Sequence, residues 1–377
     1  MLLKPKIYVF SLLIILISSS CDFLNLNVEE QEKAKIIPDK VYIDIPSCLN
    51  SDELSSNFKS SSGDSVYNYL RYYLFLKIDA ERILQQTYNR LKNIDTKGLA
   101  EFSFTGVDGN TKLVSLRQNY VLGEDTMQYY MQIYNESYSD LALEAYWNLD
   151  PLKQVITYYP SKVDVNQMQA HPDCIVKIDF NVPGSNSEFD TVSNVFLYHF
   201  TLSQKNRFMP DNMLITIGKK SNSLTLNGSI NVPEAWYFDA NYTGGRNWTF
   251  FSNCDIINNR ACVQLALPNS WYDTNENLFN EFYPKVVFAN EVRISRPDLA
   301  NLNDDEILMA MGINPDDLET PGYFNENGYF SAGESVPPGY ENLLDFNNLV
   351  PIVPVVVRDS SLTLGTKKAG MSGLIVK

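Results

Sequence analysis

The chain has 377 residues, of which 44% are hydrophobic and 20% charged, and its formal net charge at pH 7 is −15. These proportions are ordinary for a globular protein and exclude a disordered, collagen-like or coiled-coil chain. The negative charge opposes binding to nucleic acid and to anionic lipid surfaces. Because the whole chain has only 2 histidines, the sequence disfavours histidine-based catalysis and His-rich metal sites. We therefore expect neither a bound metal nor a cofactor.

Residues 1–20 have the order of features that is typical of a secretory signal peptide. A start that contains lysines is followed by an apolar run over residues 7–17 and then by serines that precede Cys21. The apolar run of roughly 11 residues is too short to cross a bilayer, which takes about 20. A charged start, a short apolar middle and small residues before a cleavage site predict secretion.

The cysteine directly after these small residues resembles the signal peptide of bacterial lipoproteins. This resemblance implies cleavage before Cys21 and a lipid on Cys21 that holds the protein in the membrane. It also implies a place in the cell envelope, as an outer-membrane lipoprotein that faces the periplasm or the cell surface. The acidic, asparagine- and tyrosine-rich chain is similar in style to surface lipoproteins of Bacteroidota. The alternative is an ordinary cleaved signal peptide with no lipid on Cys21.

Residues 21–62 are polar and rich in serine. This composition is typical of a flexible tether between a lipid anchor and a folded body. Within the tether, Val41–Ile45 alternates between apolar and polar residues, which predicts a short first strand.

A helical segment is expected over residues 63–98. Apolar residues step by three or four from Leu70 to Leu91, and Glu81 is the one charged member of this stripe. We predict a helix that ends near residue 94, with a break near Lys77–Asp79. Its apolar stripe should pack against the rest of the protein.

Residues 99–270 change to a period of two, which predicts consecutive strands with short connections. The absence of helical patterns between these strands predicts a mainly β fold, an antiparallel meander closing into a barrel or sandwich. The expected strands lie at 102–104, 114–122, 127–133, 141–147, 155–159, 176–180, 195–202, 214–217, 224–226, 248–251 and 263–267.

The C-terminal region, residues 271–377, is rich in loop-forming residues. A short helix is expected near 304–311, because Asn303 and Glu306 have the spacing of a capping box and Gly312 follows as a stop signal. Residues 314–340 are rich in Pro, Gly, Asn and Glu and predict a loop.

Four cysteines remain beyond Cys21, an even number that suits an oxidising compartment. Cys254 and Cys262 flank a turn-prone asparagine pair, so we expect a local disulfide between them. The alternative is that all the cysteines are free and buried. The pairing of Cys48 and Cys174 stays open.

Residues 235–251 concentrate aromatic and polar side chains around Gly244–Gly245. Aromatic faces that pack on sugar rings, beside planar polar groups that bind hydroxyls, are what glycan recognition requires. The alternative is that the aromatic residues belong to strands and face the core. The candidate ligand-binding residues are Trp236, Tyr237, Asn241, Tyr242, Arg246 and Trp248.

The sequence favours a non-enzymatic function, as a binding or structural module whose partner is a glycan, a peptide or another envelope protein. One alternative is a carboxylate-based, glycosidase-like hydrolase, which needs only two acidic side chains about 5–9 Å apart. Another is a subunit of a surface adhesin or transport assembly. No catalytic residue stands out, because neither Gly-x-Ser-x-Gly nor His-Glu-x-x-His nor a phosphate-binding glycine-rich loop occurs.

Overall fold

The computed structural model describes residues 36–51, 63–96, 98, 100–122, 125–137, 139–166, 173–183, 187–198, 210–232, 246–268, 278–333 and 335–346. The predicted signal peptide, Cys21 and most of the predicted tether lie outside this part of the chain. Among the helices that the structure describes, none is long and apolar enough to cross a membrane.

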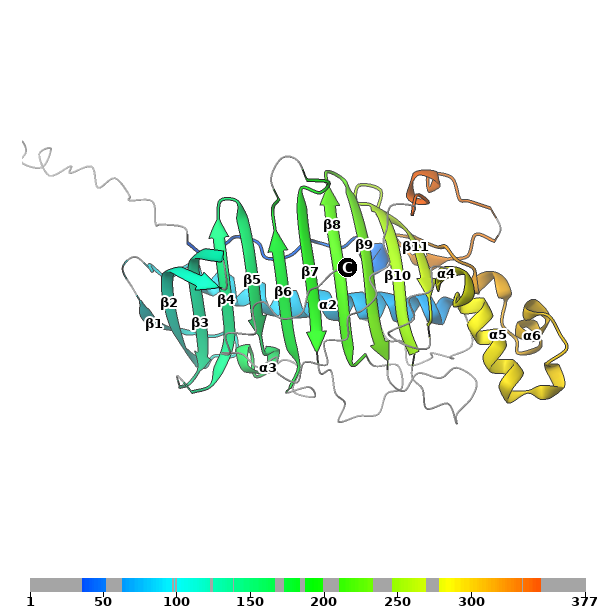
Figure 1. Cartoon of the computed structure of the whole chain (residues 1–377), viewed down its shortest axis with the longest axis horizontal. Coiled ribbons are helices and arrows are strands. Elements are labelled where there is room, and N and C mark those ends of the chain that lie inside the picture. The colour runs from blue at the N-terminus through cyan, green and yellow to red at the C-terminus, as the bar shows by residue number, and fades with distance from the viewer. Residues whose placement is uncertain are drawn as a thin grey trace, which may run out of the picture.

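The body is one antiparallel sheet of 13 strands, whose spatial order is the order of the chain (Figure 1). This confirms the predicted mainly β meander, and the strands expected between residues 102 and 267 are β1 to β11. The sheet is open rather than closed into a barrel, because β1 and β13 stand at opposite ends of the strand order. The strands are β1 (Glu101–Thr105), β2 (Thr111–Leu122), β3 (Asp125–Asn135), β4 (Leu141–Leu149), β5 (Leu152–Tyr158), β6 (Ile175–Asn181), β7 (Thr191–Tyr198), β8 (Asn212–Lys220), β9 (Ser223–Val232), β10 (Arg246–Asp255), β11 (Arg260–Ala266), β12 (Gly322–Asn325) and β13 (Gly328–Phe330).

Helix α2 (Gly63–Leu91) runs across the strands on one face of the sheet (Figure 1). Its apolar stripe is buried, as the spacing predicted, and includes Leu70, Leu74 and Leu84. The break expected near Lys77–Asp79 is wrong, because the helix is continuous there. Lys77 and Glu81 lie one turn apart and form an ion pair of 2.7 Å between Nζ and Oε2, so the charge of Glu81, the charged member of the stripe, is paired within the helix.

The N-terminal segment, residues 36–51, packs beside α2 as an extended chain. Val41, Ile43 and Ile45 are buried while Asp44 between them is exposed, so the predicted alternation is present. The strand expected there is wrong, because side chains and not a neighbouring strand satisfy the backbone. The indole of Trp147 donates a hydrogen bond to the carbonyl of Ile36 at 2.7 Å, and Lys77 donates to the carbonyl of Ile43 at 3.2 Å.

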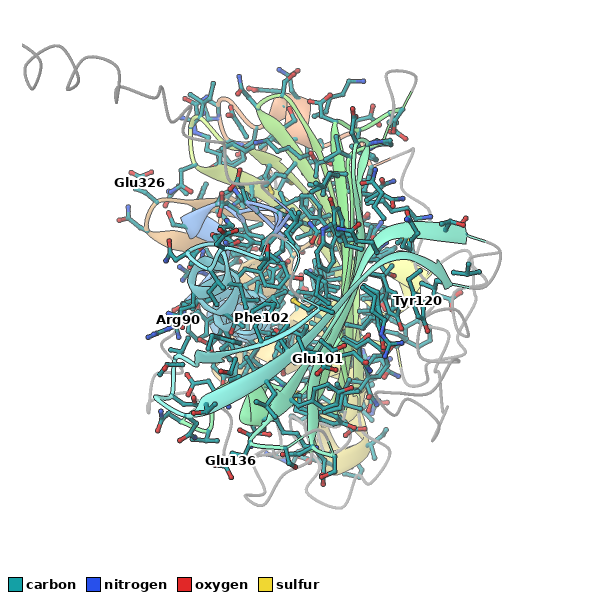
Figure 2. The ribbon with its side chains drawn as sticks, turned by 90° about the vertical axis from the view of Figure 1, so that its left-hand side faces the viewer. Arg90, Glu101, Phe102, Tyr120, Glu136 and Glu326 are labelled. Atoms are coloured by element: carbon teal, nitrogen blue, oxygen red, sulfur yellow. The ribbon has the colours of Figure 1, made fainter. Side chains whose placement is uncertain are left out.

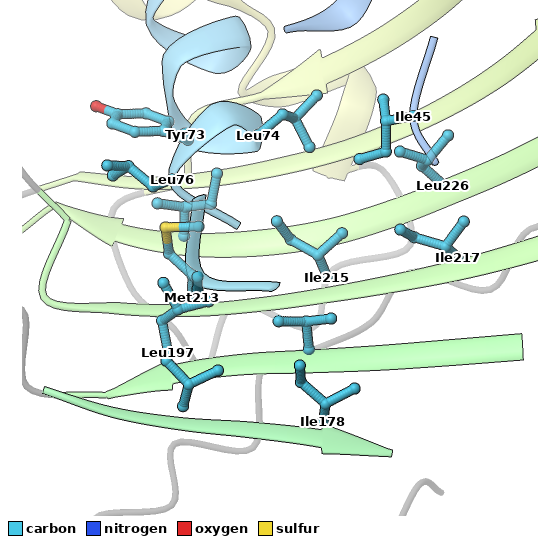
Figure 3. Close-up of a cluster of buried hydrophobic side chains, with 14 of the residues drawn as sticks. Ile45, Tyr73, Leu74, Leu76, Ile178, Leu197, Met213, Ile215, Ile217 and Leu226 are labelled. Atoms are coloured by element: carbon cyan, nitrogen blue, oxygen red, sulfur yellow. The ribbon is translucent and has the colours of Figure 1, made fainter. Parts of the chain in front are cut away.

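The core lies between the sheet on one side and α2 with the N-terminal segment on the other. Figure 3 shows Leu74 of the helix and Ile45 of the segment beside Ile215, Ile217 and Leu226 of the sheet. The three sheet residues occupy alternate positions of their strands. The two-residue period of the sequence therefore determines which face of the sheet is buried.

The remaining helices are short and mostly follow β11. The capping box at the start of α6 is confirmed. The Asn303 side-chain oxygen accepts a hydrogen bond from the backbone N–H of Glu306, and the Glu306 carboxylate accepts one from the backbone N–H of Asn303. The loop expected over residues 314–340 is partly wrong, because it contains β12 and β13. These helices are η1 (Ser47–Leu49), α3 (Pro160–Val163), α4 (Leu278–Glu281), α5 (Pro284–Ser295), η2 (Pro297–Leu299), α6 (Asp304–Ala310), η3 (Pro315–Leu318) and η4 (Glu341–Leu343).

The disulfide predicted between Cys254 and Cys262 does not form. In the pairing of β10 with β11, Cys254 lies opposite Ala261 and Cys262 lies opposite Asn253. A difference of one position turns the two side chains to opposite faces of the sheet. Cys254 belongs to the core under α2, whereas Cys262 packs with Tyr323. All the cysteines among the described residues are free and buried.

Candidate functional site

The face of the sheet opposite α2 carries a hollow of about 490 Å³ over β5, β6 and β7. This is the face that Figure 1 turns toward the viewer, with the helix behind it. Lining residues such as Val155, Asp179 and Asn194 alternate along the strands with the core residues Ile156, Ile178 and Val195. The hollow is therefore built mainly from the positions that a two-residue period turns away from the core, although Phe180 of the core also reaches it.

Strand register brings these side chains into two rows across the sheet. In one row, Asp179 of β6 lies between Val155 of β5 and Asn194 of β7. In the next row, Asn181 of β6 lies between Lys153 of β5 and Val192 of β7. Directly opposite residues in an antiparallel pair have Cβ atoms about 4.5–5.5 Å apart. The rows therefore form a small surface on which amide, carboxylate and ammonium groups stand beside branched apolar side chains.

The charges of the hollow occur in pairs of opposite sign. Lys177 Nζ lies 3.3 Å from Asp179 Oδ2, and Lys153 Nζ lies 3.0 Å from Asp125 Oδ2. The Lys177 ammonium also lies 5.5 Å from the centre of the Phe196 ring, at cation–π distance. Because each lysine faces one carboxylate, the hollow combines strong donors and acceptors without an excess of either charge.

Asp179 is the most perturbed acid of the hollow. Its burial raises the pKa of the carboxyl above the ordinary value, and the nearby Lys177 offsets this only in part. Its Oδ1 atom is buried and has no hydrogen-bond partner among the described residues. The side chain thus presents an acceptor that a bound donor would satisfy.

A tyrosine cluster adjoins the hollow on the side of β4. The rings of Tyr120 and Tyr146 each pack against Tyr130, with centres 4.2 and 4.7 Å away, and the Tyr130 hydroxyl donates to Glu144 at 2.6 Å. Burial and the negative charge of Glu144 raise the pKa of Tyr130. Figure 2 places Tyr120 on the side of the sheet away from the helix. Met127 belongs to this cluster and also lines the hollow, so the cluster forms a rigid apolar wall beside it.

The predicted exposed aromatic surface at Trp248 is wrong. Its side chain is 0% exposed, and its ring centre lies 5.3 Å from that of Tyr73 on α2. In the sheet, Asn247 pairs with Asn231 and Thr249 with Ser229 of β9. Period-two alternation turns Trp248 toward the helix, which makes it a core residue.

The other residues predicted for ligand binding are not brought together by the described structure. Trp236, Tyr237, Asn241 and Tyr242 lie outside the described residues, as does the side chain of Arg246, whose backbone begins β10. Among the residues that the structure describes, no group of three or more His, Cys, Asp or Glu side chains converges on a metal-sized site.

The residues of the hollow were visible in the sequence only as the polar members of alternating strands. Lys177 and Asp179 alternate with Val176 and Ile178, a pattern typical of any half-exposed strand. The signal that identifies them as a site is the register with β5 and β7, and no local motif encodes it.

No protein-family model matches the chain, and neither the curated proteins nor the solved structures provide a match. The fold and the site define the class: an open antiparallel sheet that is backed by one helix and carries a polar hollow on its other face. A proposal about function must therefore be argued from the geometry and chemistry of this hollow.

Proposed function

We propose that the protein is a lipid-anchored binding module of the cell envelope, and that it holds a glycan in the hollow over β5, β6 and β7. The observation that carries the proposal is the lining of the hollow, in which paired charges and amides surround apolar side chains. The lipoprotein-like signal peptide at Cys21 supports the place in the envelope, as an anchor in the outer membrane.

The chemistry of the lining favours a neutral, hydroxyl-rich ligand. A sugar ring has hydroxyls that both donate and accept, and C–H faces that pack on apolar groups. Lys153 and Asn181 offer donors, Asp179 and Asn194 offer acceptors, and Val155 offers an apolar contact. Because the lysines are matched by carboxylates, a ligand with net charge would gain little. A volume of about 490 Å³ also lies within the usual range for small-molecule sites.

The test is a glycan array followed by calorimetry on the mature, detergent-extracted protein. We expect saturable binding of at least one glycan class, and we expect Lys177→Met and Asn181→Ala to weaken it at least tenfold. Asp140→Asn is the matched control, because its 2.8 Å ion pair with Lys162 lies outside the hollow. Wild-type protein that binds no glycan at millimolar concentration would refute the proposal.

One observation favours a hydrolase as a second candidate. Asp125 and Asp179 line the same hollow in different environments, since the Asp125 side chain is 57% exposed and burial raises the pKa of Asp179. Glycoside hydrolysis uses two carboxyl groups that flank one site in different environments, one of them with a raised pKa. Product analysis of each bound glycan separates the two functions. Cleavage that disappears in both Asp125→Asn and Asp179→Asn would identify an enzyme, whereas intact glycan supports the binding module.

A further inference from the structure

A second hollow, of about 250 Å³, lies between α2 and the N-terminal segment. Its helix wall includes Glu81 and Gln85, and its other wall includes Tyr42, Asp44 and Asn50. We refer to it as the helix–segment cleft. It lies on the helix side of the sheet and shares no lining residue with the hollow over β5, β6 and β7.

Two buried acceptors in this cleft have no donor. Glu81 Oε1 and Gln85 Oε1 are both buried without a hydrogen-bond partner among the described residues. The two residues are four apart on one helix, so their side chains are neighbours on the same face. An unmatched buried acceptor is unfavourable, and two on adjacent turns point to a donor that binds both.

Each side chain is held at its other end, so the free oxygens are fixed in place. Glu81 Oε2 lies 2.7 Å from Lys77 Nζ. The Gln85 amide nitrogen donates to the Asp39 carbonyl and to Asn89 Oδ1, each at 3.0 Å. Because the nitrogen of Gln85 is committed to these acceptors, its oxygen is the atom left without a donor.

We propose that the helix–segment cleft binds a primary ammonium group of a small free amine, with Glu81 Oε1 and Gln85 Oε1 as its acceptors. An ammonium has three N–H donors and a positive charge, which suits one carboxylate oxygen and one amide oxygen. A divalent metal needs more oxygen ligands than these two provide. The volume of about 250 Å³ restricts the ligand to a small molecule.

The charges around Glu81 explain why a second cation is accepted there. Among the described residues, Lys77 on the same helix is its one ion-pair partner, and Asp44 and Lys40 of the N-terminal segment pair with each other at 2.5 Å. Arg82 also lines the cleft, and its guanidinium is paired with Asp79 of the same helix. On the sheet side, Tyr158 is the titratable group near Glu81. Burial raises the pKa of Glu81 to about 7 in spite of Lys77, so the carboxylate is incompletely stabilised.

A proton and an ammonium would compete for the same oxygen of Glu81. Binding should therefore be strongest above pH 7 and weaken by about tenfold for each pH unit below the pKa of the free site.

The experiment is calorimetry on the mature protein in phosphate buffer, with ethylammonium chloride as the probe. Tetramethylammonium is the control ligand, since it has the charge but no N–H donor. We expect saturable binding of ethylammonium at pH 8, binding at least fivefold weaker at pH 6, and none of tetramethylammonium. Absence of ethylammonium binding at pH 8, or equal binding of the two cations, would overturn the proposal.

Two variants locate the site. Gln85→Met removes one acceptor while keeping a similar side-chain length, and we expect it to weaken ethylammonium binding at least tenfold. Gln85 also holds the Asp39 carbonyl, so Lys92→Met is the matched control: it removes the other donor to that carbonyl, at 2.7 Å, and leaves the acceptors intact. Unchanged binding in Gln85→Met, or equal losses in both variants, would refute the assignment of Gln85 Oε1.

Discussion

The buried carboxyl of Glu81 gives the clearest prediction about stability. Burial raises its pKa from the ordinary value of 4.5 to about 7, and this effect outweighs the stabilisation of the anion by Lys77. An acid whose pKa is higher in the folded state binds more protons when folded than when unfolded between these two values. The free energy of unfolding must therefore fall as the pH rises from about 4.5 through about 7. Glu81→Gln should remove this dependence, because the amide has nearly the same shape and does not titrate.

The magnitude follows from the size of the shift. One pKa unit corresponds to 1.36 kcal/mol, so a shift from 4.5 to about 7 amounts to about 3 kcal/mol. Many other acids titrate in the same range, and they contribute equally to wild type and variant. The free energy of unfolding of Glu81→Gln minus that of wild type should therefore increase by about 3 kcal/mol between pH 4.5 and pH 8.

Urea unfolding of both proteins at several pH values measures this difference directly. The buffers must contain no primary amine, because the helix–segment cleft is proposed to bind one. Asp125→Asn serves as a control, since its side chain is 57% exposed and lines the hollow on the other face of the sheet from Glu81. A difference between Glu81→Gln and wild type that is constant from pH 4.5 to pH 8 would refute the reasoning.

Further predictions concern the core, the thiols, the anchor and the helix cap. Trp248→Ala should lower the free energy of unfolding by about 3–5 kcal/mol, measured by urea unfolding, because a fully buried ring is lost. Non-reducing peptide mapping should find Cys254 and Cys262 as free thiols, since their side chains lie on opposite faces of the sheet. Cys21→Ala should release the protein from the membrane or leave an uncleaved precursor, which fractionation and mass spectrometry of the N-terminus distinguish. Asn303→Ala should cost about 1 kcal/mol in a thermal melt, because it removes one half of the capping box.

The strands could be predicted from the sequence where alternation was long and regular. β6, for example, alternates between core residues such as Ile178 and outward residues such as Asp179, and this pattern is legible without its neighbours. β12 and β13 were missed because they are short and glycine-containing, and tertiary contacts determine them. A Cβ at Gly322 would lie 2.4 Å from the Tyr67 ring, and Tyr67 also stacks on Tyr329 at 4.4 Å. The packing of α2 against β12 and β13 thus helps to place these two strands, and no local sequence pattern reveals this packing.

Helix α5 shows a different kind of failure. Proline at its first position and the buried Phe288 and Val292, four residues apart, are ordinary helix signals that the sequence contains. They were not recognised in a region that composition had marked as loop. The signal existed locally, unlike that for β12 and β13, so a window of 12 residues would have been enough to find this helix.

The prediction of an exposed aromatic surface at Trp248 is wrong for the same reason that the sequence does not reveal the hollow over β5, β6 and β7. Aromatic residues beside asparagine and arginine suit both a sugar site and a strand, and only the face toward which each side chain points separates the two. Alternation turns Trp248 inward against Tyr73 and turns Asn247 outward. The same rule turns Asp179 and Lys177 outward on β6. Polar residues at outward positions are common, so the alternation alone did not single these out.

Register converts such ordinary positions into a site, and register is a property of the whole sheet. Moving β6 by one residue against β5 would place Asp179 opposite a core position and would expose Ile178, at a large cost in apolar burial. The burial of Ile156, Ile178 and Val195 on the helix side therefore fixes which polar groups meet on the other side. One strand register therefore determines both the residues of the core and the residues of the hollow. Ile178 lines no part of the hollow, but Ile178→Asn should lower the free energy of unfolding and weaken glycan binding with it. Asn181→Ala should weaken binding at least tenfold, measured by calorimetry, and leave the free energy of unfolding in urea nearly unchanged.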